Sequence, residues 1–256
     1  MEYFLVSIVA LVASILTFFS GFGLGTILLP TFLLFFPAEV AIGLTAIVHF
    51  LNNIFKTFLV GKSINFKVLL TFGGFALVGA FLGAKLLNQL SHLNNQTYFF
   101  LGFETTLLNL VVGGLLIFFA LFELVPKLKN WNLSSKYLMP GGFLSGFIGG
   151  LSGHQGALRS AFLVKAGLEK QAFIATGVAI ALVVDAVRIS VYINDFDTLI
   201  SQENATLLVC AIISAFIGAF LGKRILKKIT IGVIQGFIGM LMILMGSLLI
   251  LGILGA

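Results

Sequence analysis

The chain has 256 residues, of which 59% are hydrophobic and only 9% are charged. Soluble domains carry about 25% charged residues, so this composition excludes a cytosolic enzyme, a nucleic-acid-binding domain and a disordered chain. The formal net charge of +6 is interpreted as a record of topology, because Lys and Arg collect in cytoplasmic loops of membrane proteins. The sequence therefore predicts an all-α polytopic membrane protein.

Two apolar regions are each too long for one membrane helix and too short for two, and both are interrupted by glycines. Residues 3–36 are broken at Ser20-Gly21-Phe22-Gly23-Leu24-Gly25, and residues 137–167 are broken at Gly149-Gly150-Leu151-Ser152-Gly153-His154-Gln155-Gly156. We expect each to form a hairpin that enters the membrane and returns. Simple membrane helices are predicted at residues 39–60, 66–88, 99–124, 170–193, 205–222 and 231–255.

The second half of the chain repeats the first. An offset of 132 residues places Ser20-Gly21 on Ser152-Gly153 and Asn53 on Asp185. Beyond the 194–204 loop the offset is 139, and GAFLG at 79–83 then falls on GAFLG at 218–222. This register predicts an internal duplication, with halves 1–125 and 126–256 inside one integral membrane domain. Each half is then a glycine-broken hairpin plus three helices, an odd number of segments, so the halves are predicted to be inverted repeats.

The basic loop residues favour this topology. With two hairpins they fall almost entirely on one side of the membrane, and only Lys85 borders the other. That side is predicted to be the cytoplasm, which leaves both termini outside the cell (plasma) membrane. The pairs Gly79/Gly83 and Gly218/Gly222 are interpreted as close helix-packing sites.

Broken helices within inverted repeats are typical of secondary transporters, in which free N–H groups at the start of a half-helix attract anions. The predicted substrate-binding residues at the two breaks are Gly21, Gly23, Ser152, Gly153, His154, Gln155 and Arg159. Arg159 offers a planar fork of donors for an oxyanion, and the alternative is that it snorkels toward the basic side.

A second polar group lies on the 39–60 helix. His49, Asn52 and Asn53 share one face near its middle and are also predicted to bind substrate. Lys56 is interpreted as snorkelling to the cytoplasmic end. On the 170–193 helix, Asp185 and Arg188 form an i,i+3 pair, which is either a structural ion pair or a site of proton coupling. No catalytic motif or metal-ligand spacing is present, so neither an enzyme nor a cofactor or metal is expected.

The glycine patterns at 20–25 and 146–153, with Pro30 and the run Ile174-Ala175-Thr176-Gly177, resemble the sulfite exporter TauE/SafE family over essentially the whole chain. The resemblance implies a transporter of small, sulfur-containing anions such as sulfite or a sulfonate like sulfoacetate. The predicted function is secondary transport of such an anion by alternating access. A passive anion channel and a non-transporting membrane partner protein remain alternatives. The expected partners are the anion, the lipid bilayer, protons or another coupling ion, and a second copy of the chain in a homodimer; nucleic acid is not expected.

Overall fold

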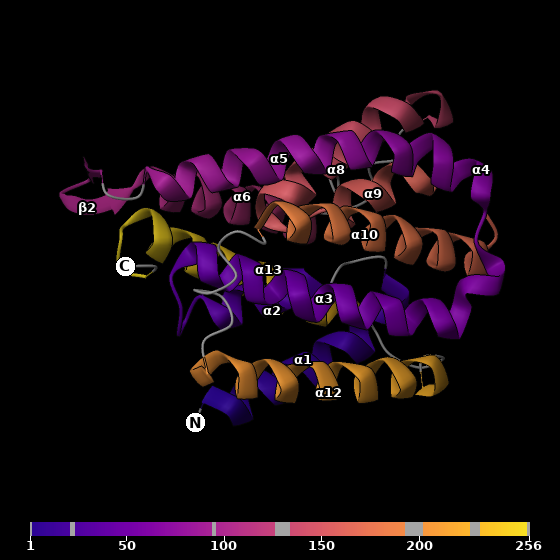
Figure 1. Cartoon of the computed structure of the whole chain (residues 1–256), viewed down its shortest axis with the longest axis horizontal. Helices are drawn as coiled ribbons and strands as arrows, with labels where there is room; N and C mark the ends of the chain where they lie inside the picture. The colour runs from indigo at the N-terminus through magenta and orange to yellow at the C-terminus, as the bar shows by residue number, and fades with distance from the viewer. Residues whose placement is uncertain are drawn as a thin grey trace.

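The computed structural model describes residues 2–20, 24–93, 96–125, 134–192, 202–225 and 231–254. They form a bundle of helices elongated along the helix axes (Figure 1). Within these residues, four helical segments are long and apolar enough to cross a membrane: Ala38–Ser63, Phe66–His92, Lys170–Tyr192 and Asn204–Arg224. An all-α membrane protein is therefore confirmed as the fold class.

The elements follow one another in a simple order. The first half contains α1 (Glu2–Ser20), α2 (Leu24–Phe32), α3 (Ala38–Val60), η1 (Gly61–Ser63), α4 (Phe66–Val68), the π-helical η2 (Leu69–Gly73), α5 (Gly74–His92), β1 (Thr97–Phe100), β2 (Phe103–Thr106) and α6 (Leu107–Leu124). The second half contains η3 (Ser135–Tyr137), α8 (Leu138–Ser152), α9 (Gly156–Leu163), α10 (Lys170–Tyr192), α12 (Gln202–Ile225) and α13 (Ile231–Ile250).

The prediction of one helix over 99–124 is wrong at its start. Residues 97–106 form the antiparallel hairpin β1–β2 instead. Its two turn residues, Leu101 and Gly102, have φ of 52° and 87°, the positive values that a two-residue hairpin turn requires. Aromatic and β-branched residues flank the turn and favour strands. The Thr106 side chain then accepts a hydrogen bond from the backbone N–H of Asn109 and begins α6 as its N-cap.

Outward-facing apolar side chains form stripes along the helices. On α5 and α12 the exposed large hydrophobic residues recur at helical spacing: Phe75, Val78 and Leu82, and Val209, Ile213 and Ile217. A soluble protein rarely exposes such surfaces, whereas lipid tails cover them in a membrane. The stripes agree with a bundle whose outer face contacts the bilayer.

Both predicted helix breaks are present in the structure. Helix α1 ends at Ser20 and α2 begins at Leu24, while α8 ends at Ser152 and α9 begins at Gly156. These boundaries, like those of α3 and α10, differ by 132 residues, which is the offset found in the sequence.

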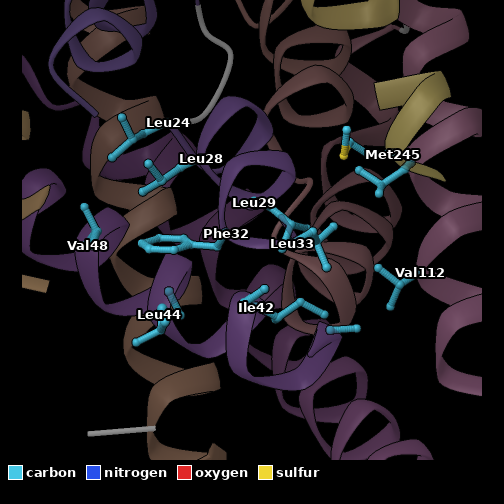
Figure 2. Packing of buried hydrophobic residues seen from close by; sticks show 14 of the residues in the cluster. Leu24, Leu28, Leu29, Phe32, Leu33, Ile42, Leu44, Val48, Val112 and Met245 are labelled. Atoms are coloured by element: carbon cyan, nitrogen blue, oxygen red, sulfur yellow. The ribbon is translucent and has the colours of Figure 1, made fainter. Parts of the chain in front are cut away.

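Helix α2 is buried on nearly all sides, unlike the outer helices. Figure 2 shows Phe32 of α2 beside Leu44 of α3, while Leu33, just past the end of α2, lies on the side of Met245 from α13. A helix that is apolar all round is found in a protein core or as a membrane span. The burial of α2 shows that it lies inside the bundle, surrounded by other helices.

The interpretation of Gly79 and Gly83 as packing residues is confirmed. Helix α5 packs on α8 so closely that a Cβ at either glycine would overlap a backbone carbonyl, that of Phe143 at Gly79 and that of Phe147 at Gly83. The absence of side chains lets the two backbones touch, which is how helices associate where lipid removes the hydrophobic driving force.

Gly83→Ala is expected to lower the free energy of unfolding by about 1–3 kcal/mol, because the added methyl group forces α5 away from α8. Gly114→Ala in α6 is the matched control, since no atom lies within 4 Å of a Cβ built there. That control is expected to be neutral or stabilising by up to about 1 kcal/mol. Thermal unfolding in detergent measures both, and equal effects of the two changes would contradict the packing role of Gly83.

Candidate functional site

Asp185 is the centre of a buried polar cluster where α3 packs on α10. Arg188 donates from Nε to Oδ1 of Asp185 at 3.0 Å, and its Nη2 lies 2.9 Å from the same oxygen. Oδ2 lies 2.6 Å from Nδ1 of His49 and accepts a hydrogen bond of 3.1 Å from the amide of Asn53. The predicted ion pair of Asp185 and Arg188 thus forms. Two predicted site residues from the first half of the chain, His49 and Asn53, contact the same carboxylate.

Lys56 lies inside the bundle, not at its end. The residue is only 4% exposed, and its Nζ donates to Oγ1 of Thr17 on α1 at 3.4 Å. When the Asn52 amide is oriented to satisfy both its ends, its oxygen accepts from Lys56 at 3.2 Å and its nitrogen donates to Oγ of Ser14 at 3.2 Å. Asn52 therefore faces α1 and α12 and does not join the cluster around Asp185.

A small cavity of about 30 Å³ lies beside this cluster. Its polar lining residues come from three helices and are Thr17, His49, Asn53, Lys56, Arg159 and Ser160. Arg159 is 6% exposed and reaches α10, where its Nε would lie 3.5 Å from a Cβ at Gly177. Of the two alternatives for Arg159, the structure thus places it at the cavity rather than at the basic surface. The volume holds one or two waters.

The charges around this cavity do not balance. Among the described residues, the buried charged side chains are the cations Lys56, Arg159 and Arg188 and the single carboxylate Asp185. With the histidines neutral, three cations against one carboxylate leave an excess of two positive charges among the buried side chains that the structure describes. Burial strengthens the resulting field, since low-dielectric walls focus it on the cavity.

Gly153 ends α8 and brings the second break close to the first. Its φ of 79° is left-handed, and its N–H bonds to the carbonyl of Gly149, which makes it a glycine C-cap. A Cβ at Gly153 would lie 2.7 Å from Nη1 of Arg188, so its lack of a side chain also makes room for the guanidinium. The carbonyl oxygen of Gly153 is 3.6 Å from the position of a Cβ at Gly25, the second residue of α2.

The other predicted residues of the second break are buried but do not line the 30 Å³ cavity. His154 stacks on Phe119 of α6 with ring centroids 5.8 Å apart, and its Nδ1 lies 3.1 Å from the carbonyl oxygen of Ser152. Within the described part of the chain, Nε2 of His154 and both amide atoms of Gln155 are buried without a hydrogen-bond partner. Gly21 and Gly23 lie outside the described residues.

A larger cavity of about 570 Å³ lies where α3 and α12 end and α10 begins. We call it the vestibule, and Lys62 and Lys223 are among its lining residues. Phe18 and Ile174 line both the vestibule and the small polar cavity. These two apolar side chains therefore stand between the basic end of the bundle and the buried charges.

Sequence reasoning missed Lys56 as a cavity residue. The sequence spacing could have indicated this position, because His49, Asn53 and Lys56 follow one another at i, i+4 and i+7 and so share a helix face. The contributions of Thr17 and Ser160 had no such signal, since isolated hydroxyl residues are common in membrane helices. The described residues contain no cluster of three or more potential metal ligands.

An apolar outer face and long apolar helices around buried polar side chains define a class, that of multi-pass membrane proteins. A family model described as "Sulfite exporter TauE/SafE" matches residues 6–249. The chain thus belongs to the sulfite exporter TauE/SafE family of membrane transporters. No curated protein and no solved structure shows significant similarity to the chain.

Proposed function

We propose that the protein is a secondary transporter of a small, sulfur-containing anion, either sulfite or a sulfonate such as sulfoacetate. The observation that carries the proposal is that two buried cations, Lys56 and Arg159, line one cavity. Two cations on one low-dielectric wall create a positive field that favours an anionic ligand. Family membership supports sulfur oxyanions as the chemical class of that ligand.

The cavity wall offers the donors that an oxyanion needs. The Arg159 guanidinium presents a planar fork that bonds two oxygens at once, and the Lys56 ammonium acts as a compact point charge. Thr17, Asn53 and Ser160 add neutral polar groups on the same wall. Gly153, His154 and Gln155 at the second break, and Gly21 and Gly23 at the first, are proposed to extend this site when it enlarges for substrate.

The proposal includes two inverted repeats, residues 1–125 and 126–256. Helix contacts support the repeats, because the same kind of glycine–carbonyl contact is found in both halves, between residues related by the offsets of 132 and 139. Gly79 and Gly83 of α5 face the carbonyls of Phe143 and Phe147 of α8, and Gly218 and Gly222 of α12 face those of Leu11 and Ile15 of α1. The glycines differ by 139 and the carbonyl residues by 132, the two offsets found in the sequence.

Contacts between equivalent residues support a two-fold relation between these halves. Asn53 bonds directly to Asp185, which lies 132 residues further on. Residues related by a two-fold axis meet one another only on that axis. We therefore place the axis through the α3–α10 contact. Helices α6 and α13, the last helix of each half, also pack on each other through Gly113 and Gly246.

A difference between equivalent residues supports the proposal of alternating access. Ile174 lines both the vestibule and the small cavity, whereas Ile42, its equivalent in the first half, is fully buried. A large cavity thus reaches Ile174 at one end of the bundle. The equivalent residue of the first half, Ile42, is covered by other side chains. We propose that this is an inward-facing state, with the basic end in the cytoplasm and both termini outside the plasma membrane. Rocking of one half against the other would exchange the roles of Ile174 and Ile42.

Transport by purified protein in liposomes tests this function. Uptake of radiolabelled sulfite is expected to saturate with concentration and to accelerate when unlabelled sulfite is preloaded inside, because a carrier returns faster when it is loaded. A passive channel would give flux without either property. A non-transporting partner protein would give no flux above protein-free liposomes, and that result would overturn the proposal.

Binding can be measured separately from transport. Sulfite at about 100 times its Kd is expected to stabilise the folded protein in detergent by roughly 2.7 kcal/mol, since it binds only the folded state. Chloride at the same ionic strength is the control for screening by salt.

A further inference from the structure

His49 is held in a defined orientation beside the proposed anion cavity. Its Nδ1 lies 2.6 Å from Oδ2 of Asp185, and its side chain forms part of the cavity wall. We propose that His49 binds the coupling proton, and that the proton and the anion bind together and cross the membrane in the same direction. This inference rests on the transport function proposed above and identifies its coupling partner.

The hydrogen bonds of Asp185 determine which nitrogen of His49 carries hydrogen. Both carboxylate oxygens face nitrogen donors, with Arg188 at Oδ1 and Asn53 at Oδ2. A carboxyl group surrounded in this way is ionised, since a protonated oxygen would be a donor pointed at donors. The close approach of Nδ1 to Oδ2 is then a hydrogen bond donated by His49. The nitrogen left for a further proton is Nε2, which lies 3.5 Å from the amide nitrogen of Asn53, and Asp185 stabilises the imidazolium that results.

The charges that face His49 come from three helices. Asp185 and Arg188 lie on α10, Lys56 lies two turns along α3, and Arg159 reaches the cavity from α9. Asp185 favours the protonated ring, whereas burial of the ring and the cations Arg188 and Lys56 oppose protonation. With the cavity empty, these opposing effects favour the neutral ring.

An anion at Lys56 and Arg159 changes this balance because it neutralises Lys56, one of the cations that oppose protonation. Protonation in turn adds a positive charge to the cavity wall and strengthens anion binding. By linkage each ligand raises the affinity for the other by the same factor. Cooperative binding of this sign leads to symport, whereas exchange of a proton for an anion would need the two to compete.

The proton balance is one proton for each anion. The proton is taken from water on one side at Nε2 of His49, and it returns to water on the other side when the anion leaves. A proton gradient directed into the compartment that receives the anion therefore drives transport, and a high anion concentration drives it in the opposite direction.

The test uses wild-type protein in liposomes, with membrane potential clamped and sulfite equal on both sides. A difference of one pH unit is expected to drive about tenfold accumulation of radiolabelled sulfite on the alkaline side, since one coupled proton converts a tenfold proton gradient into a tenfold anion gradient. Protein-free liposomes give the correction for passive movement of the acid. Wild-type protein that transports sulfite without this accumulation would overturn the inference and leave the transport function standing.

His49→Gln assigns the proton to this residue. Its amide nitrogen can still donate to Asp185 but cannot take up a proton. Because His49 lines the cavity, we expect exchange of labelled for unlabelled sulfite to slow but remain measurable, and the pH-driven accumulation to fall to about onefold. A variant that still accumulates sulfite tenfold would show that another group carries the proton. His49→Asn serves in the same assay where the glutamine variant does not fold, and His92→Gln, at the end of α5, is the control.

Discussion

Arg159→Ala is expected to reduce sulfite transport by roughly a hundredfold while the protein remains folded. Truncating a buried charged group that contacts a charged ligand costs about 2–5 kcal/mol of binding. The fold is expected to persist, because Arg159 is not one of the groups that bond to the Asp185 carboxylate. Initial transport rates in liposomes, with thermal unfolding of the same preparation, measure both effects.

Two further variants sharpen this prediction. Arg159→Lys keeps the charge but loses the planar fork, so we expect an intermediate loss. Lys85→Ala removes a cation whose Nζ lies over the ring of Phe81, away from the cavity, and is expected to leave transport unchanged. Unchanged transport by a folded Arg159→Ala protein would remove this residue from the anion site.

Asp185→Ala is expected to act mainly on stability, unlike Arg159→Ala, which acts mainly on transport. We expect it to lower the free energy of unfolding by about 3–5 kcal/mol. The carboxylate is fully buried and is the shared acceptor for Arg188, His49 and Asn53. Its removal leaves the Arg188 guanidinium buried without a counter-charge, and a buried unpaired cation is more costly than a missing pair. Thermal or denaturant unfolding in detergent measures the change.

The double variant Asp185→Leu with Arg188→Met separates the charge effect from packing. Removing both partners of a buried pair costs much less than removing one, so the double variant is expected to be more stable than Asp185→Ala. A double variant as unstable as the single one would show that the cluster stabilises the bundle through shape rather than through charge.

Much of the helix framework could be predicted from residue patterns because its causes are local. Glycine clusters end helices through backbone freedom, which is why the breaks after Ser20 and Ser152 were found. The packing of Gly79 and Gly83 also follows from spacing alone, since GxxxG places both on one helix face. The hairpin at residues 97–106 was missed because its aromatic strands have the same hydropathy as a membrane helix.

Partners within the site could not be predicted in the same way. His49 and Asp185 are separated by 136 residues and meet only because α3 packs on α10. Asn52 and Asn53 are adjacent in sequence, yet one turns to Ser14 and the other to Asp185, because neighbouring residues on a helix point about 100° apart. Lys56 was expected to snorkel, but neighbours on α1 and α3 bond its ammonium inside the bundle.

The sequence by itself determined that this chain is a membrane protein, where its helices break, which family it resembles and which polar residues are buried in apolar surroundings. Those properties depend on hydropathy, backbone freedom and spacing, which are read along the chain. Only the tertiary structure decided which charges meet, that Lys56 and Arg159 line one cavity, and that Phe18 and Ile174 line both this cavity and the vestibule. Charge balance depends on distances between helices far apart in sequence, and the packing of those helices sets these distances.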